Sequence, residues 1–152
     1  TGRLISLSCK IGGLIADAPD TDLEALEQFG LSLGKAFQVQ DDLLELTSTM
    51  DVMGKSLGSD FFAQKKTFVL LKALELANGK TRQEILDILE NSERSDADFE
   101  QLKSVLYRTG VVEMTQRYVE AEIDKAHDFL TQLYADVAHL QYLTNRLLTR
   151  KS

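Results

Sequence analysis

The 152-residue chain has one cysteine, one proline and no tryptophan, and none of its hydrophobic runs is long. The lone Cys9 excludes an intrachain disulfide framework, and a reducing cytoplasm is the simplest compartment for such a chain. No apolar run reaches the roughly 18 residues that a membrane-spanning helix needs, and no charged segment precedes a signal-peptide core. We therefore expect a cytoplasmic protein that does not span a membrane.

The scarcity of proline favours long helices, because proline breaks the intrahelical hydrogen-bond ladder. Acidic residues outnumber basic ones by 24 to 17, which gives a net charge of −7 and leaves no arginine-rich run to bind a phosphate backbone. Nucleic-acid binding is therefore a poor hypothesis. With 43% hydrophobic residues, the chain is long enough to bury the core of one domain. The composition predicts an all-α protein.

Apolar residues at spacings of three and four predict where the helices lie. The expected helices span residues 4–15, 21–46, 60–77, 81–90, 95–110, 111–134 and 137–148, with a loop over 47–59. Thr21, Thr81 and Ser95 each stand three residues before an acid, as in a capping box that opens a helix. Asn78-Gly79 has the form of a left-handed cap that ends one.

The sharpest polar cluster lies in the predicted central helix, in the segment FQVQDDLLE over residues 37–45. Gln38, Asp41 and Glu45 share one face of that helix, with Asp42 about 100° to the side. Like charges on adjacent turns destabilise a helix unless a cation offsets them. Oxygen ligands without His or Cys suit Mg²⁺, which takes one or two carboxylates and shares its shell with substrate phosphates. The alternative interpretation is a solvated acidic stripe.

Lysines follow this cluster in two short segments, GKSLGSD over residues 54–60 and QKKT over 64–67. Lysines beside an acidic metal site are explained if all these groups meet a diphosphate, whose charge needs both Mg²⁺ and ammonium groups. Gly54 and Gly58 would let the loop approach the ligand closely. A Gly-Lys pair alone is weak evidence, and the spacing is not that of a phosphate-binding Walker loop. The two clusters together predict a Mg²⁺-dependent diphosphate site.

The stretch over residues 34–74 resembles the second aspartate-rich region of the trans-isoprenyl diphosphate synthases, which include farnesyl, geranylgeranyl and longer polyprenyl diphosphate synthases. The motifs that carry the resemblance are FQxxDD, GKxxGxD and KKT, in this order. Thr1-Gly2 and the apolar helix after them resemble the segment that follows the family's Lys-Thr-Gly motif. The resemblance extends over the whole chain to its basic C-terminus.

The resemblance implies an isoprenoid-synthase-type helical bundle in which two acidic motifs on facing helices hold Mg²⁺ against an allylic diphosphate. It implies a head-to-tail condensation: the allylic diphosphate ionises, isopentenyl diphosphate attacks the cation, and a proton is lost. The family's chains are about twice as long as this one, and their first aspartate-rich motif should lie upstream of Thr1. We therefore expect residues 1–152 to be the C-terminal part of one synthase domain, inactive in prenyl transfer by itself. The apolar surface that the missing half would cover leads us to expect self-association, as a homo-oligomer, or a non-native packing of the helices.

The resemblance assigns roles to the acids and lysines residue by residue. Asp41 would ligate Mg²⁺, and Asp42 and Glu45 would complete the metal motif through metal-bound waters or by supporting the ligand. Lys55 and Lys65 would contact the allylic diphosphate as catalytic and substrate-binding residues. The family's usual third acid is an aspartate, so the glutamate at this position keeps the charge but reaches one methylene further.

Four more residues receive roles from the resemblance. Gln38 would line the diphosphate site. Thr1 would stand near the reacting carbons as a catalytic residue, next to a diphosphate-binding lysine that this sequence does not contain. Arg150 and Lys151 resemble the basic tail that closes over the homoallylic diphosphate, isopentenyl diphosphate.

Other hypotheses stay open at this point. One is a non-catalytic, synthase-like regulatory subunit that pairs with a complete synthase and changes its product length. Another is a class I terpene cyclase or a plain helical interaction module. The intact carboxylates and lysines favour an enzyme over a regulatory subunit, and the GKxxGxD loop followed by KKT argues against a cyclase.

Overall fold

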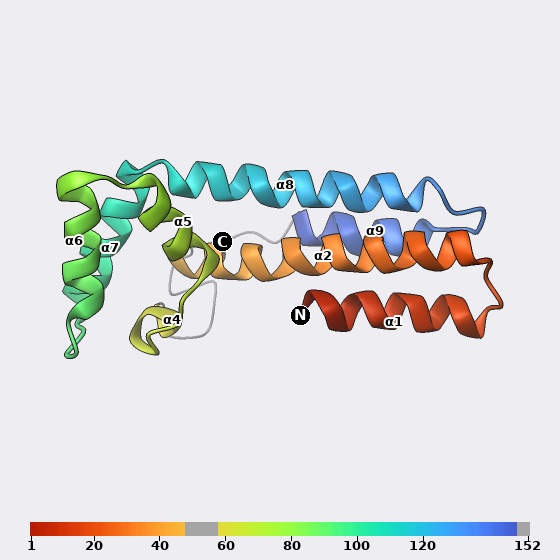
Figure 1. Ribbon diagram of the computed structural model, residues 1–152, viewed down its shortest axis with the longest axis horizontal. Coiled ribbons are helices and arrows are strands. Elements are labelled where there is room, and N and C mark those ends of the chain that lie inside the picture. Colours follow the sequence, from red (N-terminus) through yellow and green to blue (C-terminus); the bar gives the residue numbers. More distant parts are fainter. Residues whose placement is uncertain (48–57, 149–152) are drawn as a thin grey trace. The chain divides into compact units, whose positions relative to one another are not determined.

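The computed structural model of the protein describes residues 1–47 and 58–148 (Figure 1). Within these ranges every regular element is a helix, so the prediction of an all-α fold is confirmed. The helices are α1 (Gly2–Ile15), α2 (Asp20–Thr47), α4 (Ser59–Phe62), α5 (Phe68–Leu76), α6 (Gly79–Glu90), α7 (Asp96–Arg108), α8 (Val111–Leu130) and α9 (Ala138–Leu148). None of the helices in the described ranges is long and apolar enough to cross a membrane.

The described residues form two compact units. The first contains residues 1–40 and 117–148, and the second contains residues 41–47 and 58–116. Helices α1 and α9 belong to the first unit and helices α4 to α7 to the second, while α2 and α8 pass from one unit into the other. Each unit has a hydrophobic core of its own.

The core of the first unit is centred on Phe29, Ala126 and Leu130. Partly buried apolar side chains surround it, and they are Cys9, Leu33, Phe129, Leu133, Val137 and Leu140. Burial raises the pKa of the Cys9 thiol, which lowers its thiolate fraction and makes it a poor nucleophile. The position of Cys9 therefore fits the packing role that its apolar helix predicts.

Helix α1 packs on α2 through small residues. A Cβ atom on Gly34 would lie 2.4 Å from the Cα atom of Gly2, and one on Gly30 would lie 2.6 Å from the Cα atom of Ser6. Glycine at these two positions lets the two backbones come this close, because it has no side chain to keep them apart. Across the same contact, the Ser6 hydroxyl donates to the carbonyl oxygen of Glu27 at 2.8 Å.

Most of the large apolar side chains of α1 are exposed. Leu4 is 70% accessible and Ile15 is 80% accessible. The others of this set are Leu7, Ile11 and Leu14. The predicted helix is confirmed, but within the first unit it packs through its small residues rather than through the apolar stripe from which it was predicted.

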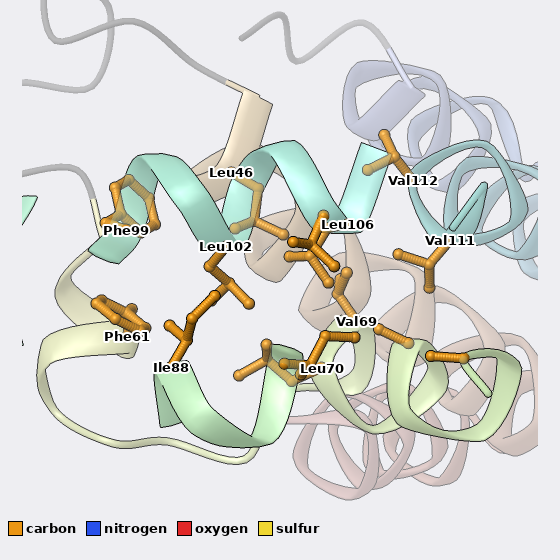
Figure 2. Packing of buried hydrophobic residues seen from close by; sticks show 14 of the residues in the cluster. Leu46, Phe61, Val69, Leu70, Ile88, Phe99, Leu102, Leu106, Val111 and Val112 are labelled. Carbon is orange, nitrogen blue, oxygen red and sulfur yellow. The ribbon is translucent and has the colours of Figure 1, made fainter. Parts of the chain in front are cut away.

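The core of the second unit joins all the helices that this unit contains (Figure 2). Figure 2 shows Leu102 and Leu106 of α7 pointing toward Val69 of α5 and Ile88 of α6. Leu46, at the C-terminal end of α2, belongs to the same cluster. The C-terminal end of α2, which carries the acidic residues of the motif, is thus packed into this core.

The helix expected over residues 60–77 is interrupted, so that prediction is wrong. Helix α4 ends at Phe62, Gln64 adopts a left-handed conformation with φ of 55°, and α5 begins at Phe68. The Thr67 hydroxyl caps α5 by accepting a hydrogen bond from the Leu70 N–H at 3.4 Å. A left-handed residue and a side-chain cap therefore divide a segment in which the apolar periodicity continues.

Two of the three predicted capping boxes are also wrong. Helix α2 begins before Thr21 and α6 begins before Thr81, so both threonines lie inside a first turn. The left-handed Gly79 opens α6 instead of closing α5. The third box is confirmed, because the Ser95 hydroxyl accepts from the Asp98 N–H while the Asp98 carboxylate accepts from the Ser95 N–H.

Candidate functional site: the acidic end of α2

Two of the predicted metal-binding acids are buried and hold the helices that follow. Asp42 and Glu45 are each 8% exposed. Asp42 Oδ2 accepts from the Phe68 N–H at 3.1 Å, at the start of α5. Glu45 Oε1 accepts from the Ser59 hydroxyl at 2.5 Å and from the Asp60 N–H at 3.0 Å, at the start of α4. Each carboxylate thus meets the N-terminal, partly positive end of a helix and ties that helix to α2.

Asp41 differs from the other two acids because its side chain is exposed. Gln38, one turn earlier on α2, is exposed as well. The sequence pattern placed Gln38, Asp41 and Glu45 on one face, yet the structure buries Glu45 because α4 covers that part of the turn. Asp41 is therefore the acid of this motif that a ligand from solvent reaches first.

Lys65 is held beside the acidic turn by Asp60. Its ammonium group forms an ion pair with the Asp60 carboxylate, and its backbone N–H donates to the Asp60 carbonyl oxygen at 2.9 Å. The hydrogen bond and the charge of Asp60 raise the pKa of Lys65, with smaller contributions from the charges of Glu45 and Asp42. The Lys65 side chain is 63% exposed. An ammonium group whose pKa is raised therefore lies at the surface next to the acids.

Two predicted site residues of the first unit contact each other. The Thr1 hydroxyl donates to Oε1 of Gln38 at 2.8 Å. This contact depends on the close approach of α1 and α2, because Gly2, the neighbour of Thr1, lies against Gly34. The pairing brings together residues that are 37 positions apart in the sequence.

The remaining predicted site residues have no structural description. Lys55, together with most of the loop expected over 47–59, lies outside the described residues. Arg150 and Lys151 lie outside them as well.

The sequence did not lead us to assign a role to several residues that form hydrogen bonds or ion pairs around the acidic end of α2. Ser59 and Asp60 supply the donors for Glu45, and Asp60 also pairs with Lys65. Asp60 ends the GKxxGxD motif, which was the available signal for it. Arg94, which donates to the carbonyl oxygen of Phe61 at a separation of 33 residues, had no signal in the sequence.

The donor set fits a hard divalent cation such as Mg²⁺, since it consists of carboxylate oxygens without His or Cys. In the part of the chain that the structure describes, no group of three or more His, Cys, Asp or Glu side chains converges as a metal cage. Asp42 and Glu45 each use one oxygen for helix N–H groups, whereas Asp41 is exposed. The arrangement fits an ion held through Asp41, with other ligands from water or a bound anion.

Comparison with known proteins finds a matching family model, similar curated proteins and similar solved structures. A model of the polyprenyl synthetase family matches residues 1–106. The geranylgeranyl diphosphate synthase of Sulfolobus acidocaldarius is 30% identical over 154 residues, covering 99% of this chain and 47% of the relative. The decaprenyl diphosphate synthase of Rhodobacter capsulatus, a solved structure, is similar with a TM-score of 0.87 at 30% identity, covering 99% of this chain and 47% of that one.

A further solved structure is that of a polyprenyl synthase from Caulobacter crescentus in complex with calcium and isoprenyl diphosphate. It is similar to this chain with a TM-score of 0.85 at 26% identity, covering 98% of this chain and 46% of that one. The chain spans about half the length of the curated relatives that it matches.

Proposed function

Since the chain belongs to the polyprenyl synthetase family, we propose that it acts in isoprenoid biosynthesis as part of a trans-prenyltransferase. The proposed reaction is the Mg²⁺-dependent, head-to-tail condensation of isopentenyl diphosphate with an allylic diphosphate. The observation that carries the proposal is a chain of contacts: Lys65 pairs with Asp60, and the Asp60 N–H binds Glu45. A lysine and an acidic turn held in one cluster suit a ligand that is polyanionic and binds divalent ions.

The described residues divide the work of such a site. Asp41 would hold Mg²⁺, while Asp42 and Glu45 fix the starts of α5 and α4. Bound Mg²⁺ supplies Lewis-acid charge that stabilises the departing diphosphate. The Lys65 ammonium group binds a diphosphate oxygen, and its raised pKa keeps it charged throughout the physiological pH range. Asp60 accepts one of the three N–H donors of Lys65, so the others serve the ligand.

Gln38 and Thr1 are proposed to contact the allylic substrate as a hydrogen-bonded pair. Gln38 precedes the acids on the same helix, and its side-chain oxygen orients the Thr1 hydroxyl. The positions assigned to Thr1, Lys55, Arg150 and Lys151 rest on the resemblance to the family.

Mg²⁺ and the diphosphate substrates have support from a relative. The Caulobacter crescentus polyprenyl synthase binds calcium and isoprenyl diphosphate in its crystal structure. Calcium and Mg²⁺ are both hard divalent cations that bind oxygen ligands. Of the two, Mg²⁺ pairs more readily with a diphosphate and few carboxylates. A cytoplasmic location and a homo-oligomeric state remain predictions, the second motivated by the exposed apolar side chains of α1.

A chimera tests this function. Residues 1–152 replace the matching segment of the Sulfolobus acidocaldarius geranylgeranyl diphosphate synthase, and incorporation of labelled isopentenyl diphosphate into prenyl products is measured with Mg²⁺. We expect product from the chimera and none from the 152-residue chain alone, and Lys65→Ala should lower the chimera's rate about tenfold or more. A folded chimera that binds pyrophosphate but forms no product, beside an active parent enzyme, would contradict the proposal.

A further inference from the structure

Helix α4 is too short to hold its own position. It has four residues, Ser59–Phe62, and its N-cap residue Gly58 offers no side-chain hydrogen bond. An isolated turn of this length is unstable in water, because nucleating a helix costs more than its first hydrogen bonds return. The position of α4 therefore depends on contacts from outside, and Glu45 supplies one of them at its N-terminal end.

Arg94 supplies the contact at the other end. Its side chain donates from Nη1 to the carbonyl oxygen of Phe61 and from Nη2 to the carbonyl oxygen of Leu89 at 2.5 Å. These carbonyls lie in the last turns of α4 and α6, where helices leave acceptors without an intrahelical partner and favour a positive charge. Arg94 thus joins the C-terminal ends of two helices with one guanidinium group.

The same guanidinium group packs on the aromatic part of α4. Its Cζ atom lies 4.7 Å from the centre of the Phe61 ring, within the range of a cation–π contact. Phe61 in turn packs on Phe99 of α7, with ring centres 5.6 Å apart. Gly58 has φ of 79°, and a Cβ atom there would come within 3.1 Å of the Phe99 ring. Little space remains for α4 to move between these groups.

We propose that Arg94 is a positioning residue for the diphosphate site: by fixing α4, it fixes Asp60 and, through Asp60, the ammonium group of Lys65. The inference rests on the proposed function for the identity of the ligand. The connection is continuous, since Arg94 holds Phe61, α4 contains both Phe61 and Asp60, and Asp60 binds Lys65 through its carboxylate and its carbonyl oxygen.

The position calls for arginine rather than lysine. Two carbonyl oxygens on different helices are bound at once, which matches the planar fork of a guanidinium group. A lysine at position 94 keeps the charge but has a single nitrogen to share between the two acceptors. Arg94→Lys should therefore give an effect between those of the wild type and Arg94→Ala.

The test measures binding of inorganic pyrophosphate with Mg²⁺ to the 152-residue chain by titration calorimetry. Arg94→Ala should raise the dissociation constant about tenfold, as expected when a charged hydrogen-bond partner is lost. Lys65→Ala should have a similar effect, and the double variant should bind no more weakly than Lys65→Ala alone. Arg108→Ala is the matched control, because Arg108 pairs with Glu84 on the exposed faces of α7 and α6, and it should bind like the wild type.

Hydrogen exchange gives a readout that needs no ligand. In Arg94→Ala, the Phe62 and Lys65 amides, which donate to Gly58 and Asp60 in the wild type, should exchange at least about tenfold faster. Exchange in α1 should stay unchanged, which separates local release of α4 from loss of the fold. If Arg94→Ala unfolds, the same two amides are measured in Arg94→Lys, where a smaller acceleration is expected.

The possible results separate the two claims. Unchanged exchange at Phe62 and Lys65, or additive effects of Arg94→Ala and Lys65→Ala on pyrophosphate binding, would overturn the positioning role. A wild-type chain that binds no pyrophosphate would overturn the diphosphate site and the proposed function, while faster exchange in Arg94→Ala would still establish that Arg94 holds α4.

Discussion

Replacing Asp41 by asparagine is expected to weaken Mg²⁺-dependent binding of pyrophosphate by about 100-fold or more. Asp41 is the exposed acid of the motif, and the substitution removes the charge while keeping the size of the side chain. Loss of residues that merely support a metal ligand costs about 10–100-fold in metal affinity, so loss of a direct ligand should reach at least the upper limit. Titration calorimetry of the chain with pyrophosphate, with and without Mg²⁺, measures the effect.

Asp124→Asn serves as the control for this prediction. Asp124 is an exposed acid on α8, so the change in net charge and in helix chemistry is the same. It should leave the Mg²⁺-dependent affinity within about twofold of the wild type, because Asp124 is not part of the acidic motif and the charge of an exposed side chain is screened by salt. Equal losses in the two variants would mean that Asp41 contributes only through the net charge of the chain. The assignment of Asp41 as metal ligand would then be wrong.

Replacing Gly34 by alanine is expected to lower the free energy of unfolding by about 1–3 kcal/mol, the usual cost of overpacking. The new Cβ atom would lie 2.4 Å from the Gly2 Cα atom, and backbone atoms cannot yield as a flexible side chain does. Helix α1 must then move away from α2, which separates Thr1 from Gln38. Urea denaturation followed by circular dichroism measures the stability.

Gly12→Ala is the matched control on α1. A Cβ atom at Gly12 meets nothing within 4 Å, and alanine favours a helix by up to about 1 kcal/mol over glycine. This variant should therefore be as stable as the wild type or more stable. If Gly34→Ala were stabilising to the same extent, the close contact between α1 and α2 would not exist in solution.

The sequence predicted the helices well, because their apolar periodicity is a local property. It failed where a helix boundary depends on distant residues. The break between α4 and α5 coincides with a hydrogen bond from the Phe68 N–H to Asp42, which is 26 residues away. The cap at Thr67 is local, but a threonine followed by apolar residues is too common to mark a helix start without that partner.

The packing of α1 shows another limit of the sequence. Periodicity identifies an apolar stripe, but it does not say what the stripe contacts. Ser6 and Gly13 are the buried residues of this helix, whereas Leu4 and Ile15 are exposed. The spacing of Gly30 and Gly34, one turn apart on α2, was the local signal that a neighbouring backbone comes close.

The motifs predicted which residues form the candidate site, but not the helix contacts that bury two of its acids. The residue pattern alone separated Asp41, Asp42 and Glu45 only by their angle on the helix, and it was the resemblance to the family that assigned Asp41 as the Mg²⁺ ligand and the other two as supporting residues. Their difference arises from α4 and α5, whose N–H groups occupy Glu45 and Asp42 and leave Asp41 exposed. Arg94 was not predicted at all, because its role depends on the meeting of two helix ends that are remote in sequence.

The central claim is that Asp41 and Lys65 bind one diphosphate through a divalent ion. The most direct measurement is the ¹H–¹⁵N NMR spectrum of the chain during addition of Mg²⁺ and pyrophosphate, separately and together. We expect large shifts at the amides of residues 41–45 and 59–66 when both are present, and much smaller shifts with either one alone. Shifts confined to other helices, or equal shifts without Mg²⁺, would contradict it.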